Sequence, residues 1–196
     1  MTNSNLEAAI SEFKKGKLII VIDEKHRENE GDLVLAAQFV TPEKINFMIK
    51  HARGLVCVPM LGKRLDELKL PPMTKINTEL HKCKFTVSVD CKYGTTTGIS
   101  AYDRAKTIKA LIDKKTKPDD LAKPGHIFPL RCDDGGLGKR MGHTEACIKL
   151  CKLAGLYPTA VLCEIISDNG KMAKLPELKK MAKKWNIHII TISALA

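Results

Sequence analysis

Residues 142–166, GHTEACIKLCKLAGLYPTAVLCEII, carry the two side-chain periodicities that decide the fold class. The first half has the i, i+3, i+4, i+7 spacing of a helix with one buried face, formed by Cys147, Leu150, Cys151 and Ala154. Gly155 is of a type common just after a helix end. The run at 160–166 is short and rich in Val, Leu and Ile, which favours a buried strand. A helix that leads into a strand indicates a domain in which helices pack on a sheet.

The same alternation extends along the rest of the chain. Apolar runs rich in Val and Ile predict strands at 17–22, 33–40, 55–58, 85–89, 160–166 and 187–192. Helical spacing and end signals predict helices that start at Thr41-Pro42, cover 102–113, start near Gly142, and cover 171–185. We therefore expect a single compact α+β domain over 1–196, with an α/β-type mixed sheet flanked by helices.

The net charge is the first clue to function. The 196-residue chain holds 33 Lys+Arg against 22 Asp+Glu, a net charge of +11, and 44% of its residues are hydrophobic. This apolar content can build a core and excludes wholesale disorder. The charge favours an anionic partner, which could be nucleic acid, a membrane surface or a phosphorylated small molecule. Aromatic residues make up only 5% and are not interleaved with basic ones, which argues against single-stranded nucleic acid.

Two further features bear on the compartment. No apolar run approaches the roughly 20 residues that cross a membrane, and the first residues lack the pattern of a signal peptide. We therefore expect a cytoplasmic chain with no membrane partner. The seven cysteines are odd in number and no Cys-x-x-Cys occurs, so reduced, mostly buried thiols are expected instead of a disulfide framework or zinc ribbon.

An acidic segment, DEKHRENEGD at 23–32, follows the first predicted strand. Its ten residues include five carboxylates, two basic side chains and one histidine. One interpretation is a charged surface turn. The other is a divalent-cation site, because carboxylates this close repel one another unless a cation offsets them. Mg²⁺ binds through one or two carboxylates together with water or substrate oxygens.

A glycine-rich segment, GGLGKRMGHTE at 135–145, runs into a predicted helix. Backbone amides at a helix N-terminus and the helix dipole both favour phosphate, and the neighbouring basic side chains add to that preference. The segment is not a Walker loop, because the spacing differs and no Lys-Ser/Thr pair closes it. A glycine-rich turn with Thr144 as a helix cap explains the pattern equally well.

Two titratable residues stand in unusual positions. Glu164 lies inside the apolar run 160–166, where a buried carboxylate needs a cation or a hydrogen-bond donor, or a raised pKa. It could be an acid/base group at a strand end or a residue on the wet face of an edge strand. His126 is flanked by Pro124, Gly125 and Pro129, which stiffen the backbone around it. A lone histidine of this kind is more often structural than catalytic.

Taken together, these segments resemble those of 3,4-dihydroxy-2-butanone 4-phosphate synthases, enzymes of riboflavin biosynthesis. RENEGD at 27–32 and GHTEA at 142–146 on one chain are far more specific together than either is alone. The resemblance covers nearly the whole chain, through ordered blocks: DEKHRENEGD (23–32), GLVCVPM (54–60), FTVSVD (85–90), TTGISAYDRAKTI (96–108), PGHIFPLR (124–131), GHTEACIKLCKLAGL (142–156) and VLCEIISDNGKMA (161–173).

The resemblance implies a lyase that converts D-ribulose 5-phosphate into 3,4-dihydroxy-2-butanone 4-phosphate and formate. It implies two divalent ions per site, Mg²⁺ or Mn²⁺, and a homodimer with active sites at the subunit interface. The partner is then a phosphosugar, with no nucleic acid and no membrane. Because imidazole prefers softer metals than Mg²⁺, a histidine ligand leaves Mn²⁺ open.

The same resemblance assigns roles to individual residues. Glu28 and His143 match the metal ligands. The positions that match the substrate-binding set are Arg27, Glu28, Asp32, Thr97, Arg140, Met141, Gly142, His143, Thr144 and Glu164. Of these, Arg140, Thr144 and Thr97 are expected on the phosphate. The positions that match catalytic groups are Glu164 and His126, which the family requires for activity, and Asp23 and Cys57, which are proposed proton-transfer partners.

Two other functions remain as alternatives. A charge-driven binder of nucleic acid or phospholipid would bind polyanions in a strongly salt-dependent way. A relative that keeps the fold without the activity is also conceivable, because fold does not fix function.

Overall fold

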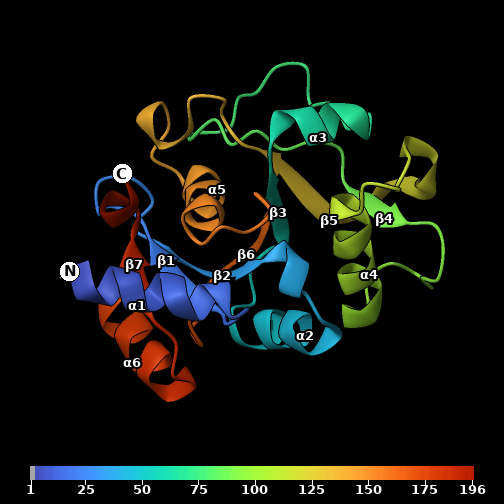
Figure 1. Ribbon diagram of the computed structural model, residues 1–196. Coiled ribbons are helices and arrows are strands. Elements are labelled where there is room, and N and C mark those ends of the chain that lie inside the picture. The colour runs from blue at the N-terminus through green and yellow to red at the C-terminus, as the bar shows by residue number, and fades with distance from the viewer. Residues whose placement is uncertain (1–2) are drawn as a thin grey trace.

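A seven-stranded sheet forms the centre of the computed structural model, which describes residues 3–196 (Figure 1). Residues 1 and 2, the start of the predicted domain, lie outside the described part. The strands are β1 (Ile19–Ile22), β2 (Gly31–Ala36), β3 (Cys57–Met60), β4 (Val89–Cys91), β5 (Leu121–Arg131), β6 (Ala160–Glu164) and β7 (Ile189–Thr191). The helices are α1 (Asn3–Lys14), α2 (Pro42–His51), α3 (Gly62–Glu67), α4 (Ala101–Ile112), α5 (His143–Leu153) and α6 (Leu175–Trp185).

The strand order is β4-β5-β3-β6-β2-β1-β7. Strand β1 pairs antiparallel with β2 and parallel with β7. Strand β6 pairs antiparallel with β2 and β3, whereas β3 and β5 are parallel. The sheet is therefore mixed, and the predicted α+β class is confirmed.

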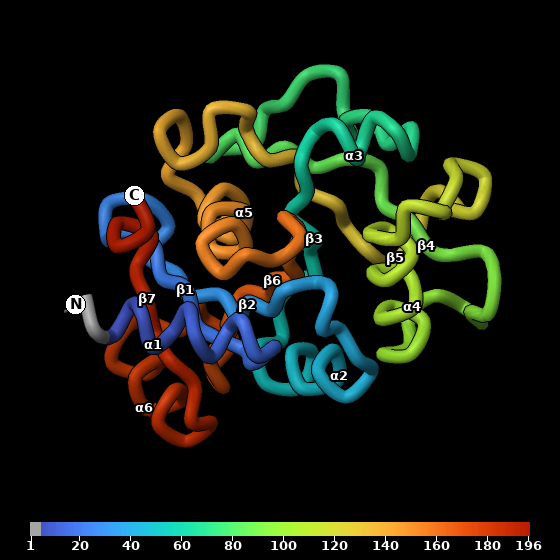
Figure 2. The backbone as a smooth tube through the Cα atoms, viewed as in Figure 1, coloured from blue at the N-terminus to red at the C-terminus, as the bar shows by residue number. Residues whose placement is uncertain are grey.

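Both faces of the sheet are buried. Side chains of a strand alternate between the two faces, so each strand contributes to two cores. In β1, Ile20 and Ile22 join a core with residues of α2, α4 and α6, whereas Ile19 and Val21 join a second core with residues of α1 and α5. The C-terminal end of the chain returns to the side of the molecule where α1 lies (Figure 2). There the Asn5 side-chain amide donates to the Ile189 carbonyl at 3.2 Å. Helix α5 thus packs over strands that also carry the acidic segment.

Several predicted elements are confirmed with their end signals. Helix α2 begins after Thr41, whose hydroxyl oxygen accepts the Lys44 amide at 3.3 Å, and Pro42 occupies the first turn. In α5, Cys147 and Cys151 are fully buried. In α6 the face with Leu178 is inward, and the C-cap residue Asn186, which follows the helix, adopts a left-handed conformation. Local side-chain spacing was sufficient to find these helices.

Other elements differ from the predictions. Helices α1 and α3 were not predicted. The predicted strand at 33–40 is shorter, because residues 37–39 form a 3-10 turn. The predicted strand at 85–89 shares only Val89 with β4.

The long strand β5 was not predicted, because it contains two prolines and a glycine. Its pairing with β4 shifts register between Val89 and Asp90, so residues 123–126 bulge out of the ladder. Side chains satisfy the amides in this bulge: Ser88 accepts the Gly125 amide at 3.1 Å and Asp90 accepts the His126 amide at 2.9 Å. The strand is thus held in place by side-chain hydrogen bonds that replace ladder bonds.

All seven cysteines are unpaired and six of them are buried, as expected for reduced thiols. Within residues 3–196, none of the helices is long and apolar enough to cross a bilayer.

Candidate functional site

A hollow of about 190 Å³ opens where β1, β2 and β6 end or begin and where α5 starts. Most of the predicted site residues line it. Its walls are formed by Arg27, Glu28, Glu30, Asp32, Cys57, Glu79, Cys83, Phe85, Leu130, Arg140, His143, Thr144, Leu162 and Glu164. Charged groups that are far apart in sequence thus meet in one small space.

The buried Asp23 carboxylate holds the acidic segment together through hydrogen bonds. Its Oδ2 accepts the Glu28 amide and an Arg27 guanidinium nitrogen, Nη1, both at 2.9 Å, and its Oδ1 accepts the Glu30 amide at 2.8 Å. The Asp23 side chain is only 1% exposed. The loop is therefore wrapped around one carboxylate, and this wrapping directs Glu28 into the hollow. The assignment of Asp23 to proton transfer stays a prediction.

Glu28 and His143 form a close pair across the hollow. Nδ1 of His143 lies 3.5 Å from Glu28 Oε2 and 3.9 Å from Asp32 Oδ2. Burial acts to raise the pKa of Glu28, but the hydrogen bond to His143 and the charge of Arg27 lower it to about 2. Burial acts to lower the pKa of His143, but Asp32, Glu28 and Asp23 raise it to about 9. In the metal-free protein the pair is therefore an ion pair at neutral pH.

Asp32 and Glu164 add two more carboxylates to the same wall. Burial, together with the charges of Glu164 and Glu28, raises the pKa of Asp32. Glu164 accepts the Leu55 amide at 2.8 Å, so a hydrogen-bond donor, one of the expected partners, is present. A Cβ on Gly54 would collide with Glu164, so the absence of a side chain there leaves room for the carboxylate.

These residues fit a divalent cation. Asp23, Glu28 and His143 each offer a ligand atom, and these atoms lie within 4.8 Å of one another. Two buried atoms of this site, Asp32 Oδ1 and His143 Nε2, have no hydrogen-bond partner among the residues that the structure describes. Buried polar atoms are normally paired, so such orphans indicate a missing ligand. Carboxylate oxygens with one imidazole suit Mg²⁺ or Mn²⁺.

The basic end of the hollow is built around Arg140. Its guanidinium donates to Glu145 Oε2 at 2.7 Å and to the His81 carbonyl at 3.3 Å. Helix α5 starts after Gly142, which has no side-chain cap, so the alternative of Thr144 as the cap is wrong. The first amides of the helix are left for another acceptor. Arginine, amides and the Thr144 hydroxyl together can bind an anion.

Sequence reasoning missed Glu145 as a functional neighbour. It is 2% exposed and holds Arg140 with one oxygen while the other accepts the Asp133 amide at 3.0 Å. An acidic residue in the first helical turn, five positions after an arginine, was the available signal. Cys83 and Phe85 were also missed, and nothing in their local sequence pattern marked them.

Two further predicted site residues differ in their position relative to the hollow. Met141 is exposed and does not line the hollow. Cys57 does line it, and burial and the charge of Glu164 raise its pKa well above the usual thiol value. The assignment of Cys57 to proton transfer, like that of Asp23, stays a prediction.

Thr97 and His126 do not line the hollow either. His126 is 42% exposed and binds Asp90, while Thr97 lies on an exposed loop before α4. Asp103 anchors that loop by accepting the Thr96 and Gly98 amides, both at 3.1 Å. The chain thus carries two separate groups of predicted site residues.

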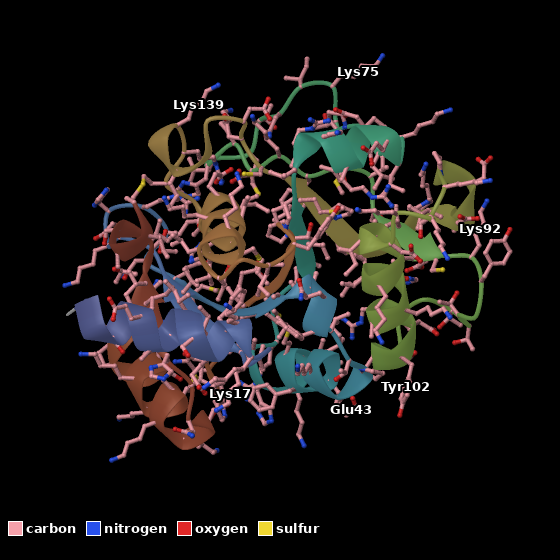
Figure 3. The ribbon with its side chains drawn as sticks, viewed as in Figure 1. Lys17, Glu43, Lys75, Lys92, Tyr102 and Lys139 are labelled. Carbon is pink, nitrogen blue, oxygen red and sulfur yellow. The ribbon has the colours of Figure 1, made fainter. Side chains whose placement is uncertain are left out.

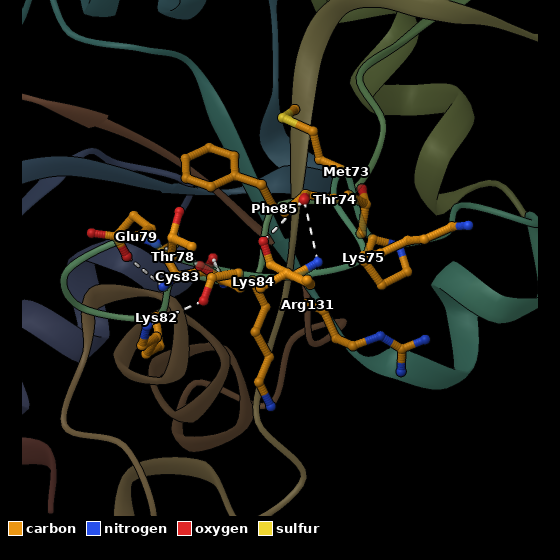
Figure 4. Close-up of a pocket in the computed structure, with 14 residues that line it drawn as sticks. Met73, Thr74, Lys75, Thr78, Glu79, Lys82, Cys83, Lys84, Phe85 and Arg131 are labelled. Atoms are coloured by element: carbon orange, nitrogen blue, oxygen red, sulfur yellow. Dashed lines mark hydrogen bonds between the residues drawn. The ribbon is translucent and has the colours of Figure 1, made fainter.

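A larger hollow of about 620 Å³ adjoins the first and shares Glu79, Cys83 and Phe85 with it (Figure 4). Its other walls are mainly apolar and basic. The Glu79 carboxylate is engaged in its own turn, where it accepts the His81 and Cys83 amides at 2.9 and 2.7 Å. The metal-compatible chemistry belongs to the smaller hollow.

Several lysines lie on the outer surface and do not line this hollow. Lys17, Lys75, Lys92 and Lys139 project outward around the molecule (Figure 3). Their separation fits the interpretation of a solvated surface better than that of one continuous polyanion track.

The fold and the site together define a class: α+β proteins that gather carboxylates and a histidine at strand ends, beside an arginine and a helix N-terminus. Comparison with known proteins narrows this class. The family model of 3,4-dihydroxy-2-butanone 4-phosphate synthase matches residues 7–196. The protein of that name from Agrobacterium fabrum is 51% identical over 195 residues, covering 100% of this chain and 92% of that protein. The chain belongs to the 3,4-dihydroxy-2-butanone 4-phosphate synthase family, as its motifs predicted.

Other relatives are longer. The riboflavin biosynthesis protein RibBA of Endomicrobium trichonymphae is 56% identical over 187 residues, which are 95% of this chain and 46% of that protein. The chain thus spans about half the length of such relatives. Among solved structures, a 3,4-dihydroxy-2-butanone 4-phosphate synthase in complex with two magnesium ions has a TM-score of 0.93 at 40% identity. That match covers 97% of this chain and 94% of the other.

Proposed function

We propose that this chain converts D-ribulose 5-phosphate into 3,4-dihydroxy-2-butanone 4-phosphate and formate, as a lyase of riboflavin biosynthesis. One observation carries the proposal: Glu28, Asp32, His143 and Glu164 face Arg140 and the start of α5 across one small hollow. Membership of the family supports it. A phosphosugar has both the oxygens that a metal binds and the phosphate that the basic end accepts.

The phosphate belongs at the basic end. Arg140, the Thr144 hydroxyl and the first amides of α5 supply charge and hydrogen bonds there. Binding energy from a group remote from the reacting carbons can hold those carbons in place. Arg140 therefore acts mainly on substrate affinity.

The reacting carbons belong at the acidic end. Glu28 and His143, with Asp23 beneath them, are the residues that would hold divalent ions, Mg²⁺ or Mn²⁺. Such ions would neutralise negative charge that develops on neighbouring substrate oxygens. A relative in complex with two magnesium ions supports two ions per site. We assign proton transfer at the substrate carbons to Glu164, a carboxylate that lines the hollow and is held by the Leu55 amide.

The position of Thr97 and His126 supports a homodimer. His126 matches a position that the family requires for activity and Thr97 matches a phosphate contact, yet neither lines the hollow of its own chain. We propose that a second copy presents them to that hollow, so that each active site lies at the subunit interface. The exposed Tyr93, Ile99 and Tyr102 on the same part of the chain supply apolar surface for such a contact. The unpaired cysteines support a cytoplasmic location.

The decisive experiment is a formate assay with ribulose 5-phosphate. Formate release that EDTA abolishes and Mg²⁺ or Mn²⁺ restores is the expected result. No formate with either metal, together with salt-dependent retention on a polyanion, would favour the charge-driven binder instead.

Subunit sharing has its own test. Glu28→Ala and His126→Ala chains, each with little activity alone, are mixed and left to exchange subunits. If each site uses both copies, every mixed dimer has one intact site, and about a quarter of the parental activity returns. A mixture that stays inactive although mass spectrometry shows mixed dimers would contradict the shared site.

A further inference from the structure

We propose that Asp90 is a positioning residue that fixes the ring tautomer and orientation of His126. This inference rests on the proposed function, because His126 matters only if it meets a substrate. Asp90 lies on β4 and His126 in the bulge of β5 that faces it. Neither the motifs nor the family comparison gave Asp90 a role.

Both oxygens of the Asp90 carboxylate are committed to His126. Oδ1 accepts the His126 backbone amide at 2.9 Å, and Oδ2 lies 2.7 Å from the ring nitrogen Nδ1. One side chain thus binds the main chain and the ring of the same residue, which fixes both the position of Cα and the rotation of the ring. Because a carboxylate only accepts hydrogen bonds, Nδ1 must carry the proton.

This arrangement decides which nitrogen is presented. With the proton on Nδ1, the second ring nitrogen, Nε2, has a free lone pair in the neutral ring. The His126 side chain is 42% exposed whereas that of Asp90 is 13% exposed, so the bound side of the ring is inward and the other side is open. The ring therefore offers a proton acceptor, in a fixed direction, to whatever lies against this surface.

The loop at Gly98 packs directly against the hydrogen-bonded pair of Asp90 and His126. Gly98, at φ +91°, lies so near that a Cβ there would collide with Asp90 Oδ2 and with His126 Nδ1. Thr97 directly precedes Gly98, and Asp103 holds the Gly98 amide at 3.1 Å. The loop that carries Thr97 thus rests on the Asp90–His126 pair, which places two family-matched residues on one rigid support.

A purely structural explanation is that Asp90 only closes the bulge by binding the His126 amide. Asp90→Asn separates the two roles. The asparagine oxygen can still accept that amide, but its NH₂ group then faces Nδ1 and donates to it. The ring must respond by moving its proton to Nε2, which removes the acceptor that it presents.

The experiment measures the tautomer and the reaction separately. Nitrogen-15 spectra of the ring at alkaline pH should show the proton on Nδ1 in the parent protein and on Nε2 in Asp90→Asn. The formate rate should fall about 100-fold in Asp90→Asn with little change in KM. In a His126→Gln background the same change should have no further effect, because Asp90 acts through His126. Asp119→Asn, an exposed change of equal charge, is the control.

Each outcome is decisive. An unchanged tautomer, or an equal loss of rate with and without His126, would overturn the proposal. If Asp90→Asn does not fold, Asp90→Glu, which keeps the acceptor, should show the Nδ1 proton and partial activity, and a proton on Nε2 there would overturn it as well. If the parent protein releases no formate, the proposed function fails, but the nitrogen-15 result still tests the Asp90 assignment.

Discussion

Asp32 and Glu164 lie directly opposite each other on the antiparallel strands β2 and β6. Like charges at such positions repel, and Asp32 is 2% exposed. Burial and the neighbouring carboxylates raise the pKa of Asp32, and its Oδ1 is unpaired among the described residues. In the metal-free protein these two carboxylates therefore lower the stability of the folded state. Functional sites often retain such a cost, because activity depends on the same residues.

Replacing Glu164 by glutamine should separate stability from activity. The amide oxygen can still accept the Leu55 amide, whereas the charge opposite Asp32 is removed. We expect formate release to fall about 100-fold or more, and the melting temperature of the metal-free protein to stay the same or rise. Rate assays and thermal unfolding check this, with Glu7→Gln as the exposed control. A parental formate rate would make Glu164 merely structural.

Replacing Glu28 by alanine should abolish metal-dependent turnover. Glu28 is the carboxylate that the acidic loop directs toward His143. We expect Mn²⁺ affinity, followed by electron paramagnetic resonance, to fall about tenfold or more. Glu24→Ala in the same loop is a matched control, because Glu24 does not line the hollow. Near-parental turnover by Glu28→Ala would contradict the metal assignment.

Metal binding should release a proton from His143. The surrounding carboxylates raise the pKa of this buried ring to about 9, so it is protonated at neutral pH, whereas a ligating imidazole must be neutral. Apparent affinity should therefore weaken about tenfold for each pH unit below 9, until the carboxylates also titrate. Calorimetry of Mn²⁺ binding in buffers of different ionisation enthalpy measures the proton count. Equal heats in all buffers would show that His143 is no ligand, and His143→Asn should lose the proton release.

The fold was largely predictable where local patterns determine structure. The structure confirms three elements predicted from local patterns. They are helix α5, from the apolar face that ends at Ala154, helix α2, from the cap at Thr41, and strand β6, from the apolar run at 160–166. Strand β5 could not be found this way, because its prolines break the usual signal. What holds its bulge in place is a pair of side chains, Ser88 and Asp90, that lie more than thirty residues away in sequence.

Most residues of the predicted site line one hollow, but their roles stay predictions and their arrangement could not be read from the sequence. The acidic segment and the glycine-rich segment each left a structural alternative open, and motif resemblance favoured the functional one. No local pattern indicated that Asp23 would be enclosed by its own loop, or that Glu145 would hold Arg140, since both depend on tertiary contacts. The separation of His126 from the hollow likewise follows from sheet pairing, which no local motif records.

Replacing Arg140 by alanine should mainly weaken substrate binding. Its guanidinium is held by Glu145 and the His81 carbonyl at the basic end of the hollow. Its proposed role is to bind the phosphate, whereas Glu28 and Glu164 are proposed to act at the reacting carbons. We expect KM for ribulose 5-phosphate to rise about tenfold or more with a smaller change in kcat. Glu145→Gln should raise KM in the same direction, because an arginine that loses its charged partner is less firmly oriented. Lys139→Ala, an exposed neighbouring change, should leave KM unchanged. A fall in kcat at constant KM would instead place Arg140 at the reacting carbons.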